Sequence, residues 1–369
     1  MRVALVHDYL YQMGGAERVV LALHEMFPEA PLYTSIYDRD RMPAEFKRME
    51  ITTSFMQKLP WIFKKPRHYF WLYPRAFESF DLSSFDLIIS SSSAFAKGIK
   101  KPHHTKHVCY CHTPMRFVWR YQTYIQEEGI NPLYKMLLPA FLSQLKNWDL
   151  KANRGVDHFI VNSKVVAGRV REYYDRDSVI IYPPVDTRLF QPQARLPDGQ
   201  VIHSDHFLIV SRLLPYKRLD IAVKAFSELG LPLKIVGEGP DEGRLKKLAG
   251  RNVEFLGRLN DDEAVVRLYA GCRALIFTGE EDLGLAPLEA ASCGRPTIAY
   301  AKGGALETII EDATGVFFKE QSADSLKAAV NRFTQMRFDG RAVRRQAEGF
   351  DKENFKKKVE RFLHENKIL

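Results

Sequence analysis

Two glutamates, Glu281 and Glu289, stand eight residues apart where a strand-like run, 273–279, passes into a helical pattern. Eight residues on a helix make slightly more than two turns, so a carboxylate at the mouth of the helix and one at this spacing can face the same ligand. One carboxylate could then reach one part of a polyhydroxylated molecule, and the second another. Taken alone, the pair is equally well explained by a solvated acidic run and a surface helix residue.

Two cations, Arg212 and Lys217, lie in the segment 206–226 between a buried-strand run and an amphipathic helical pattern. Beside a helix N-terminus, the free amides and the helix dipole add to such charges. This combination is typical of a site for phosphate or diphosphate, although an isolated pair at this spacing is more often surface charge.

Glycines are placed as a nucleotide site requires. Gly14 and Gly15 follow the first strand-like run and can form a turn whose amides approach a phosphate, although a plain strand-to-helix turn explains them equally well. Gly237-x-Gly239 is followed by Glu242 where a dinucleotide fingerprint needs its third glycine. We interpret this fragment as a nucleotide-side turn and not as an NAD site.

Apolar runs alternate with helical patterns in two rounds, which predicts an α/β protein with two doubly wound parallel sheets. Two such halves leave a cleft at the carboxyl ends of their strands. The proline-rich, polar segment 183–200 predicts the boundary, with an N-terminal domain at 1–183 and a C-terminal domain at 184–350. The predicted strands are 2–8, 31–38, 85–93, 106–113, 157–163 and 178–184, then 206–212, 232–239, 253–259, 273–279, 296–303 and 315–319.

Length and composition fit this organisation, because 369 residues suit two domains better than one core. No run of eighteen apolar residues occurs, and the first ten residues read as a strand and a turn, which argues against a membrane span or a signal peptide. Four cysteines do not form a disulfide framework in so long a chain. We therefore expect a reducing cytoplasmic compartment.

Cys109, Cys111 and His112 raise the alternative of a zinc site. Their ligand atoms would come from one strand-like run, without the usual spacer or a second cluster. We interpret the run as a buried strand and expect no metal.

At the level of whole motifs, the chain resembles the retaining glycosyltransferases of the GT-B fold, a large family that includes sucrose synthases, glycogen synthases and bacterial polysaccharide mannosyltransferases. The motifs follow the family's order over almost the whole chain. Leu283 departs from the pattern, since the family usually has phenylalanine there, but the exchange is apolar. The matching motifs are Gly14-Gly15, YCHTPMRFVW around His112, SRLLPYK at 211–217, VGEGP at 236–240, FLGRL at 255–259, and the pair Glu281 and Glu289.

The resemblance implies a front-face transfer with retention, in which the departing phosphate takes the acceptor proton. With two fixed cations at the leaving diphosphate, a divalent metal is not required. The diphosphate would be neutralised by two cations and by backbone amides, from Arg212, Lys217, Gly14, Gly15, Gly284 and Leu285.

The same resemblance implies roles for the remaining residues. Glu281 would accept hydrogen bonds from the donor sugar and Glu289 from the nucleotide ribose. His112 would lie near the donor sugar, unless its ring is satisfied by neighbouring backbone. Backbone around Phe255–Arg258, including Arg258, and Gly237 would border the base.

Positive charge is concentrated in the first half, with a net charge of +7 in residues 1–183 and +2 in residues 184–369. The segment 58–75 carries five cations and no acids, with aromatic residues between them. Nucleic acid, an anionic membrane surface and a solvated basic face are the three interpretations. Given the fold that the resemblance implies, we favour the membrane. Nucleic acid is disfavoured because no nucleic-acid motif occurs and the second half is nearly neutral. The resemblance implies a saccharide acceptor linked to undecaprenyl diphosphate at the inner face of the cell membrane.

The donor is predicted from resemblance alone. Residues 111–121 and the two donor-side motifs are similar to mannosyltransferases of O-antigen and exopolysaccharide assembly, which implies GDP-mannose, with a UDP-hexose as the second choice. No further cofactor is expected. The resemblance also implies that the last helical pattern, 351–367, crosses back to the first domain. A GT-B epimerase of UDP-N-acetylhexosamine and a non-catalytic nucleotide-sugar-binding protein are the alternatives, against which Glu281, Lys217 and His112 all argue.

Overall fold

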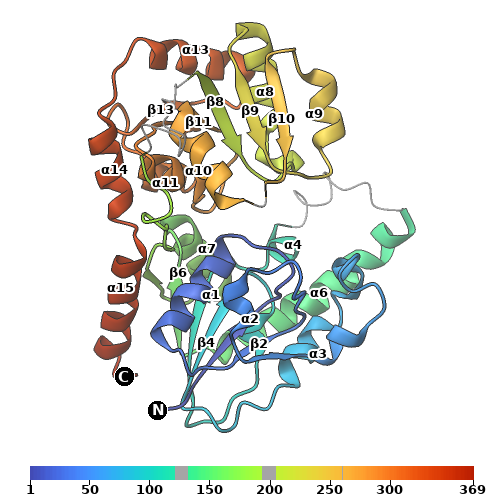
Figure 1. The fold of residues 1–369 in the computed structure, drawn as a ribbon. Helices are drawn as coiled ribbons and strands as arrows, with labels where there is room; N and C mark the ends of the chain where they lie inside the picture. The colour runs from blue at the N-terminus through green and yellow to red at the C-terminus, as the bar shows by residue number, and fades with distance from the viewer. Residues whose placement is uncertain (121–131, 193–204, 260) are drawn as a thin grey trace. The chain divides into compact units, whose positions relative to one another are not determined.

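The computed structural model describes residues 1–120, 132–192, 205–259 and 261–369 (Figure 1). The chain forms two compact units, one of Met1–Pro184 with Phe355–Leu369 and one of Val185–Asn354. The division falls after Pro184, in the proline-rich segment 183–200, of which residues 193–200 lie outside the described residues.

A seven-stranded parallel sheet forms the first domain, in the order β3-β2-β1-β4-β5-β6-β7. Every predicted strand of this half is present, but β3 was missed because it is short and has a single apolar residue. The strands are β1 Val3–His7, β2 Leu32–Thr34, β3 Ile51–Thr53, β4 Leu87–Ser92, β5 Lys106–Cys111, β6 His158–Val161 and β7 Val179–Ile180.

Helices cover both faces of this sheet. Alternate strand residues point to opposite sides, and here both sets are apolar and need to be covered. Leu5 packs in the cluster that contains α1 and α15, whereas Ala4 and Val6 pack in the cluster that contains α3 and α6. The α-helices are α1 Gly15–Met26, α2 Ala44–Lys47, α3 Tyr73–Glu78, α4 Arg116–Trp119, α6 Pro132–Arg154, α7 Lys164–Tyr174 and α15 Lys352–Glu365, with 3-10 helices η1 Phe55–Lys58, η2 Pro66–Tyr69 and η3 Ala96–Gly98.

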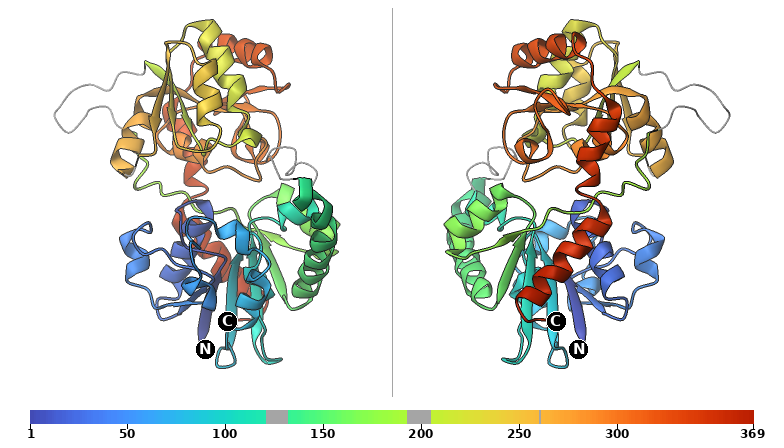
Figure 2. Two further views of the ribbon diagram at one scale, coloured as in Figure 1. Left: turned by 90° about the vertical axis from the view of Figure 1, so that its right-hand side faces the viewer. Right: turned by 90° about the vertical axis from the view of Figure 1, so that its left-hand side faces the viewer.

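The last helix, α15, belongs to the core of the first domain, as predicted. Its buried residues Phe355, Val359 and Phe362 pack in the same cluster as Leu5 of β1. Figure 2 shows α15 lying along the first domain, with the C-terminus near the N-terminus. The ion pair between Lys356 and Glu25, 2.5 Å, ties α15 to α1.

The second domain contains a six-stranded parallel sheet in the order β10-β9-β8-β11-β12-β13 (Figure 1). All six predicted strands are present. They are β8 His206–Val210, β9 Leu233–Val236, β10 Val253–Gly257, β11 Cys272–Phe277, β12 Thr297–Tyr300 and β13 Gly315–Phe318.

This sheet is also covered on both faces. Phe207 and Ile209 of β8 pack with α8 and α13, while α10 and α11 contact β8 and β11. The amphipathic helix α8 is capped at its C-terminal end by Gly230, whose φ of 68° suits glycine. The helices are η4 Pro215–Lys217, α8 Leu219–Leu229, α9 Glu242–Leu248, α10 Asp262–Gly271, α11 Ala286–Ser292, α12 Ala305–Thr308, α13 Ala323–Thr334 and α14 Gly340–Glu348.

Within the described parts of the chain, no helix is both long and apolar enough to cross a membrane.

Candidate active site

Four predicted site residues of the second domain follow the carboxyl ends of its strands. Lys217 follows β8, Gly237 follows β9, Arg258 follows β10 and Glu281 follows β11. Because all strands of the sheet are parallel, these ends lie at one edge, which is where open α/β sheets bind ligands.

The centre of this edge is an ion pair between Lys217 Nζ and Glu281 Oε1, 2.5 Å apart. The two side chains are only 11% and 20% exposed. Thr278 Oγ1 donates to the carbonyl of Lys217 at 2.8 Å, and the backbone N–H of Gly304 donates to the carbonyl of Glu281 at 2.9 Å. Both charged residues are thus fixed through their backbones, and a cation and a carboxylate stand together at the sheet edge.

Glu289 lies in α11 and accepts a hydrogen bond from the hydroxyl of Tyr269, with 2.7 Å between Oε2 and the phenol oxygen. Both residues are buried. The helical spacing predicted for Glu281 and Glu289 is wrong, because Glu281 precedes the helix, which begins at Ala286. The segment between them includes Gly284 in a left-handed conformation, so the two carboxylates are placed by a loop and a helix separately.

Glycine is required at two of the predicted positions. Gly284 has φ 82°, and a Cβ there would lie 2.5 Å from the ring of Phe277. Gly237 has φ 134°, and a Cβ there would overlap the carbonyl of Ser211. These two glycines let the loops after β11 and β9 pack closely at the edge. Leu285 directly precedes α11 and its carbonyl accepts from the N–H of Glu289 at 2.9 Å.

The two predicted arginines are exposed. Arg258 forms a 3.5 Å ion pair with Glu238, and both side chains are largely in solvent. Arg212 follows β8, and no ion pair joins its guanidinium to a carboxylate of the described residues. The structure therefore brings Lys217 and Glu281 together and leaves Arg212 outside that pair.

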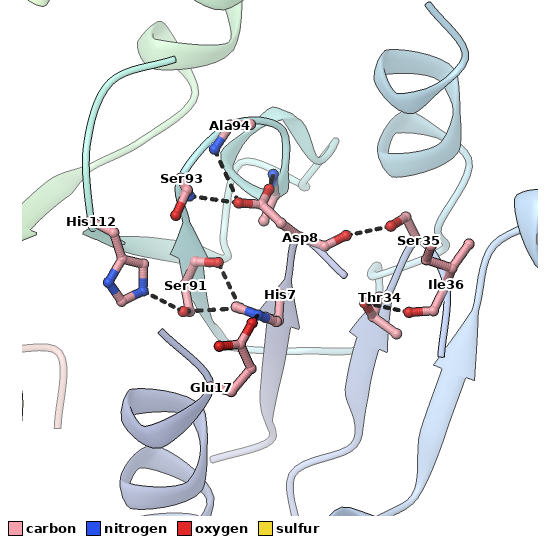
Figure 3. Close-up of polar contacts among 11 residues, drawn as sticks. His7, Asp8, Glu17, Thr34, Ser35, Ile36, Ser91, Ser93, Ala94 and His112 are labelled. Atoms are coloured by element: carbon pink, nitrogen blue, oxygen red, sulfur yellow. Dashed lines mark hydrogen bonds and ion pairs between the residues drawn. The ribbon is translucent and has the colours of Figure 1, made fainter. Parts of the chain in front are cut away.

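In the first domain, His112 directly follows β5 and is 8% exposed. Its Nε2 lies 2.8 Å from Oγ of Ser91, and its carbonyl accepts from Nδ2 of Asn162 at 3.0 Å. Figure 3 shows that Ser91 also faces His7, whose opposite ring nitrogen faces Glu17.

Gly14 and Gly15 lie at the start of α1. Gly14 caps the helix with extended backbone, and its carbonyl accepts from the N–H of Arg18 at 3.2 Å. A Cβ at Gly14 would lie 3.0 Å from Oε2 of Glu17. The glycine turn is therefore packed against a buried carboxylate.

The loop after β4 is held by Asp8, which directly follows β1 and is buried. Its carboxylate accepts four backbone N–H groups, from Ser93 at 2.5 Å, Ala94 at 3.0 Å, Phe95 at 2.7 Å and Ala96 at 2.7 Å. Four such bonds anchor this loop beside His112's partner Ser91.

Sequence reasoning missed Tyr269, His7, Glu17 and Ser91. Tyr269 has the pattern of a core residue of an amphipathic helix, so its hydroxyl gave no signal. His7 did give a signal in the sequence, because a titratable residue at the carboxyl end of the first buried strand lies at the sheet edge where ligand sites form.

Across the described ranges, no three histidine, cysteine, aspartate or glutamate side chains gather as a possible metal site. Cys109 and Cys111 are buried on one face of β5 and pack with α7. The pKa of the Cys111 thiol is raised well above its usual range by a hydrogen bond with Cys109 and by burial. A thiol held protonated in this way is a poor metal ligand.

Each domain matches a family model. Residues 13–189 match Glycosyltransferase Family 4, and residues 202–350 match Glycosyl transferases group 1.

Several curated relatives are mannosyltransferases. The chain is 37% identical over 134 residues to the GDP-mannose-dependent monoacylated alpha-(1-6)-phosphatidylinositol monomannoside mannosyltransferase of Corynebacterium glutamicum, covering 31% of this chain and 34% of that protein. It is 31% identical over 140 residues to the O-antigen chain mannosyltransferase C of Escherichia coli, covering 36% of this chain and 38% of that protein. The chain spans little more than a third of the length of these two relatives.

Among solved structures, HepE of Anabaena in complex with UDP has the same fold. The TM-score is 0.72 at 17% identity, over 99% of this chain and 100% of that one. The chain therefore has the GT-B fold, and each of its two parallel-sheet domains matches a glycosyltransferase family model, the second domain that of the group 1 glycosyltransferases.

Proposed function

We propose that the protein is a retaining glycosyltransferase that moves α-mannose from GDP-mannose to a lipid-linked oligosaccharide in bacterial polysaccharide synthesis. The observation that carries the proposal is the largely buried ion pair of Lys217 and Glu281 at the carboxyl edge of the second sheet, in a domain that matches the group 1 glycosyltransferases.

Lys217 would neutralise the leaving diphosphate and keep its ion pair with Glu281. An ammonium group has three N–H donors, so one can bind Glu281 while the others bind phosphate oxygens. Positive charge fixed where negative charge develops stabilises the transition state. The exposed Arg212 would close on the same diphosphate, and the amides of Gly284 and Leu285 would add to it, so that no divalent metal is needed.

The two carboxylates would recognise different parts of the donor. Glu281 has its second oxygen for the hydroxyls of the sugar, because Lys217 bonds to Oε1. Glu289 would accept from the ribose hydroxyls, with Tyr269 fixing the orientation of its carboxylate. Backbone around Gly237 and Arg258 would border the base.

His112 of the first domain would contact the donor sugar. The turn at Gly14 and Gly15 would contact the diphosphate. Bond breaking gives the sugar oxocarbenium character. The departing phosphate would then take the acceptor's proton on the same face, which retains the configuration.

A strip of exposed aromatic and basic residues on the first domain supports an acceptor at a membrane. Trp61 is 73% exposed and Trp71 is 53% exposed, and Lys64 and Lys65 are exposed beside them. The N–H groups of both lysines donate to the carbonyl of Trp61 at 2.9 Å, which fixes the turn. Tryptophan with lysine suits the interface of an anionic bilayer. We place the protein in the cytoplasm, on the inner face of the cell membrane.

The choice of guanine as the donor base rests on the relatives. The name of the Corynebacterium glutamicum relative specifies GDP-mannose. A UDP-hexose is the second candidate, because HepE, which shares the fold, was solved with UDP.

Incubation of the full chain with a panel of sugar nucleotides and lipid-linked acceptors, followed by mass spectrometry, tests the proposal. We expect a product heavier by one hexose only with GDP-mannose, and nuclear magnetic resonance of that product should show the α-anomer. Transfer from a UDP-hexose would show that the donor is not GDP-mannose, and a β-linked product would overturn retention. No transfer from any sugar nucleotide to any acceptor would remove the proposal.

A further inference from the structure

Four buried side chains of the first domain form one hydrogen-bonded row: His112, Ser91, His7 and Glu17 (Figure 3). Their exposed fractions are 8%, 1%, 2% and 4% in that order. Ser91 lies on β4, between β1 and β5 in the sheet, and is paired in register with His7. The sheet itself therefore places the serine between the two histidines.

The proton positions at His7 follow from its partners. Its Nε2 lies 3.4 Å from Oε1 of Glu17, and an ionised carboxylate only accepts, so Nε2 carries a proton. Its Nδ1 lies 3.1 Å from the carbonyl oxygen of Ser91, which also only accepts, so Nδ1 carries a proton as well. His7 is then an imidazolium ion.

The electrostatics agree with this assignment. Burial lowers the pKa of the His7 imidazole, but the hydrogen bond and charge of Glu17, the charge of Asp8 and the carbonyl of Ser91 outweigh it, so the pKa is raised above 6.5.

The hydroxyl of Ser91 determines which nitrogen of His112 carries a proton. Its Oγ lies 3.1 Å from the protonated Nδ1 of His7 and must accept there. Its own proton is then directed to its other partner, Nε2 of His112, at 2.8 Å. An imidazole nitrogen that accepts a hydrogen bond carries no proton, so the proton of a neutral His112 lies on Nδ1.

We propose that Glu17, His7 and Ser91 are positioning residues that hold His112 as the neutral Nδ1–H tautomer. The inference rests on the proposed function, in which His112 lies near the donor sugar. An imidazolium at that place would repel the positive charge that develops on the sugar, whereas a neutral ring can donate one hydrogen bond without this cost.

Gly14 is part of the same arrangement. Since a Cβ at this position would lie 3.0 Å from Oε2 of Glu17, glycine leaves room for the carboxylate to reach His7. The glycine turn and the histidine are thus connected through Glu17.

Nitrogen magnetic resonance of the full chain labelled at its histidines tests the tautomer directly. The chain has 11 histidines, and the His112 signals are assigned by their loss in His112→Gln. Near neutral pH and without substrate, we expect the Nε2 of His112 to resonate as an unprotonated nitrogen and Nδ1 as a protonated one. A protonated Nε2 in the wild type would overturn the proposal.

Variants show whether the row causes this state. Ser91→Ala should move proton population to Nε2 and lower kcat about tenfold with little change in KM for the donor, whereas Ser91→Thr, which keeps the hydroxyl, should preserve both. If Ser91→Ala does not fold, Glu17→Gln serves instead, because a neutral His7 no longer forces Ser91 to donate to His112. A tautomer unchanged in these variants would contradict the proposal.

The magnetic resonance readout needs no substrate. A chain that shows the expected tautomer but transfers no sugar supports the row and overturns only the proposed function.

Discussion

At the scale of residues, the two carboxylates of the second domain are held by different partners. Glu281 is paired with a cation that would serve the diphosphate, and Glu289 with the hydroxyl of a buried tyrosine. Because their partners differ, we expect their substitutions to affect different kinetic constants.

Glu281→Gln should lower kcat strongly, and Glu289→Gln should chiefly weaken donor binding, with about 1–3 kcal/mol lost for each hydrogen bond to a charged group. Glu281→Gln should leave GDP affinity nearly unchanged, since Glu281 would contact the donor sugar, which GDP lacks. Steady-state kinetics and GDP titration measure the two effects. Wild-type constants in both variants would show that the site is elsewhere.

Tyr269→Phe is the matched control for Glu289. It removes the phenol oxygen that bonds to Oε2 and keeps the ring that packs against Phe190. Donor binding should weaken less than in Glu289→Gln, because the carboxylate remains but loses one support.

Residue types and order predicted which side chains follow the strands, but not how they pair. The pairing of Lys217 with Glu281 depends on loops after β8 and β11 that are distant in the chain. The row through Ser91 depends on the strand order β1-β4-β5, which local patterns do not encode.

At the scale of elements, a buried ion pair joins η3 to α6. Lys97 Nζ and Asp149 Oδ1 are 2.5 Å apart, with 1% and 0% of their side chains exposed. Asp149 Oδ2 also accepts from Nε1 of Trp119 at 2.7 Å and from the hydroxyl of Tyr174 at 2.8 Å. Burial lowers the pKa of Lys97, but the charge of Asp149 outweighs it and the pKa is raised.

Lys97→Met should destabilise the first domain by about 3–5 kcal/mol, because it leaves Asp149 buried without its cation. Calorimetric unfolding measures the loss. The double variant Lys97→Met/Asp149→Asn should recover part of it, since an asparagine oxygen can still accept from Trp119 and Tyr174. An unfolding temperature unchanged by Lys97→Met would contradict the role of the pair.

His107 of β5 should make the first domain sensitive to acid. Burial lowers its pKa from 6.5 to about 4, against the charge of Asp157. Below pH 6.5 the unfolded chain therefore binds a proton that the folded chain does not, and the free energy of unfolding falls as the pH falls toward about 4. Between pH 6.5 and about pH 5 the loss should be about 2 kcal/mol.

Calorimetry of the wild type and His107→Gln across this range isolates the contribution. The unfolding temperature of the variant should depend less on pH. Equal pH dependence in the two proteins would show that His107 is protonated in the folded state.

The elements were predictable because buried parallel strands are continuous apolar runs, so every predicted strand overlaps an observed one. The residues at which the strands end were not predictable in this way. The run 206–212 was predicted as a strand, yet β8 ends at Val210 and Arg212 belongs to the loop. Residues that serve a site continue the extended pattern beyond the hydrogen-bonded strand.

At the scale of the molecule, the positive charge of the first half coincides with the exposed strip near Trp61. Replacing Trp61, Trp71, Lys64 and Lys65 by serine should release the protein from anionic vesicles and leave hydrolysis of the donor intact. Phe63, which lies in the same basic and aromatic segment 58–75, packs partly buried against the core and is left unchanged.

Lys357→Ser/Lys358→Ser is the control for charge alone, because both lysines are exposed on α15. It should retain vesicle binding in a sedimentation assay. Equal binding by the strip variant and the wild type would remove the membrane surface from the proposal.

In the proposed function, the second domain binds the nucleoside diphosphate of a GDP-sugar through Lys217 and Glu289. Isothermal titration of the full chain with GDP and UDP tests it most directly. We predict that GDP binds at least about tenfold tighter than UDP, a gap of about 1.4 kcal/mol, and that Lys217→Met and Glu289→Gln weaken the binding of GDP. Tighter binding of UDP would contradict the mannose donor, and GDP binding that is absent or unaffected by both substitutions would show that the nucleotide does not bind at Lys217 and Glu289.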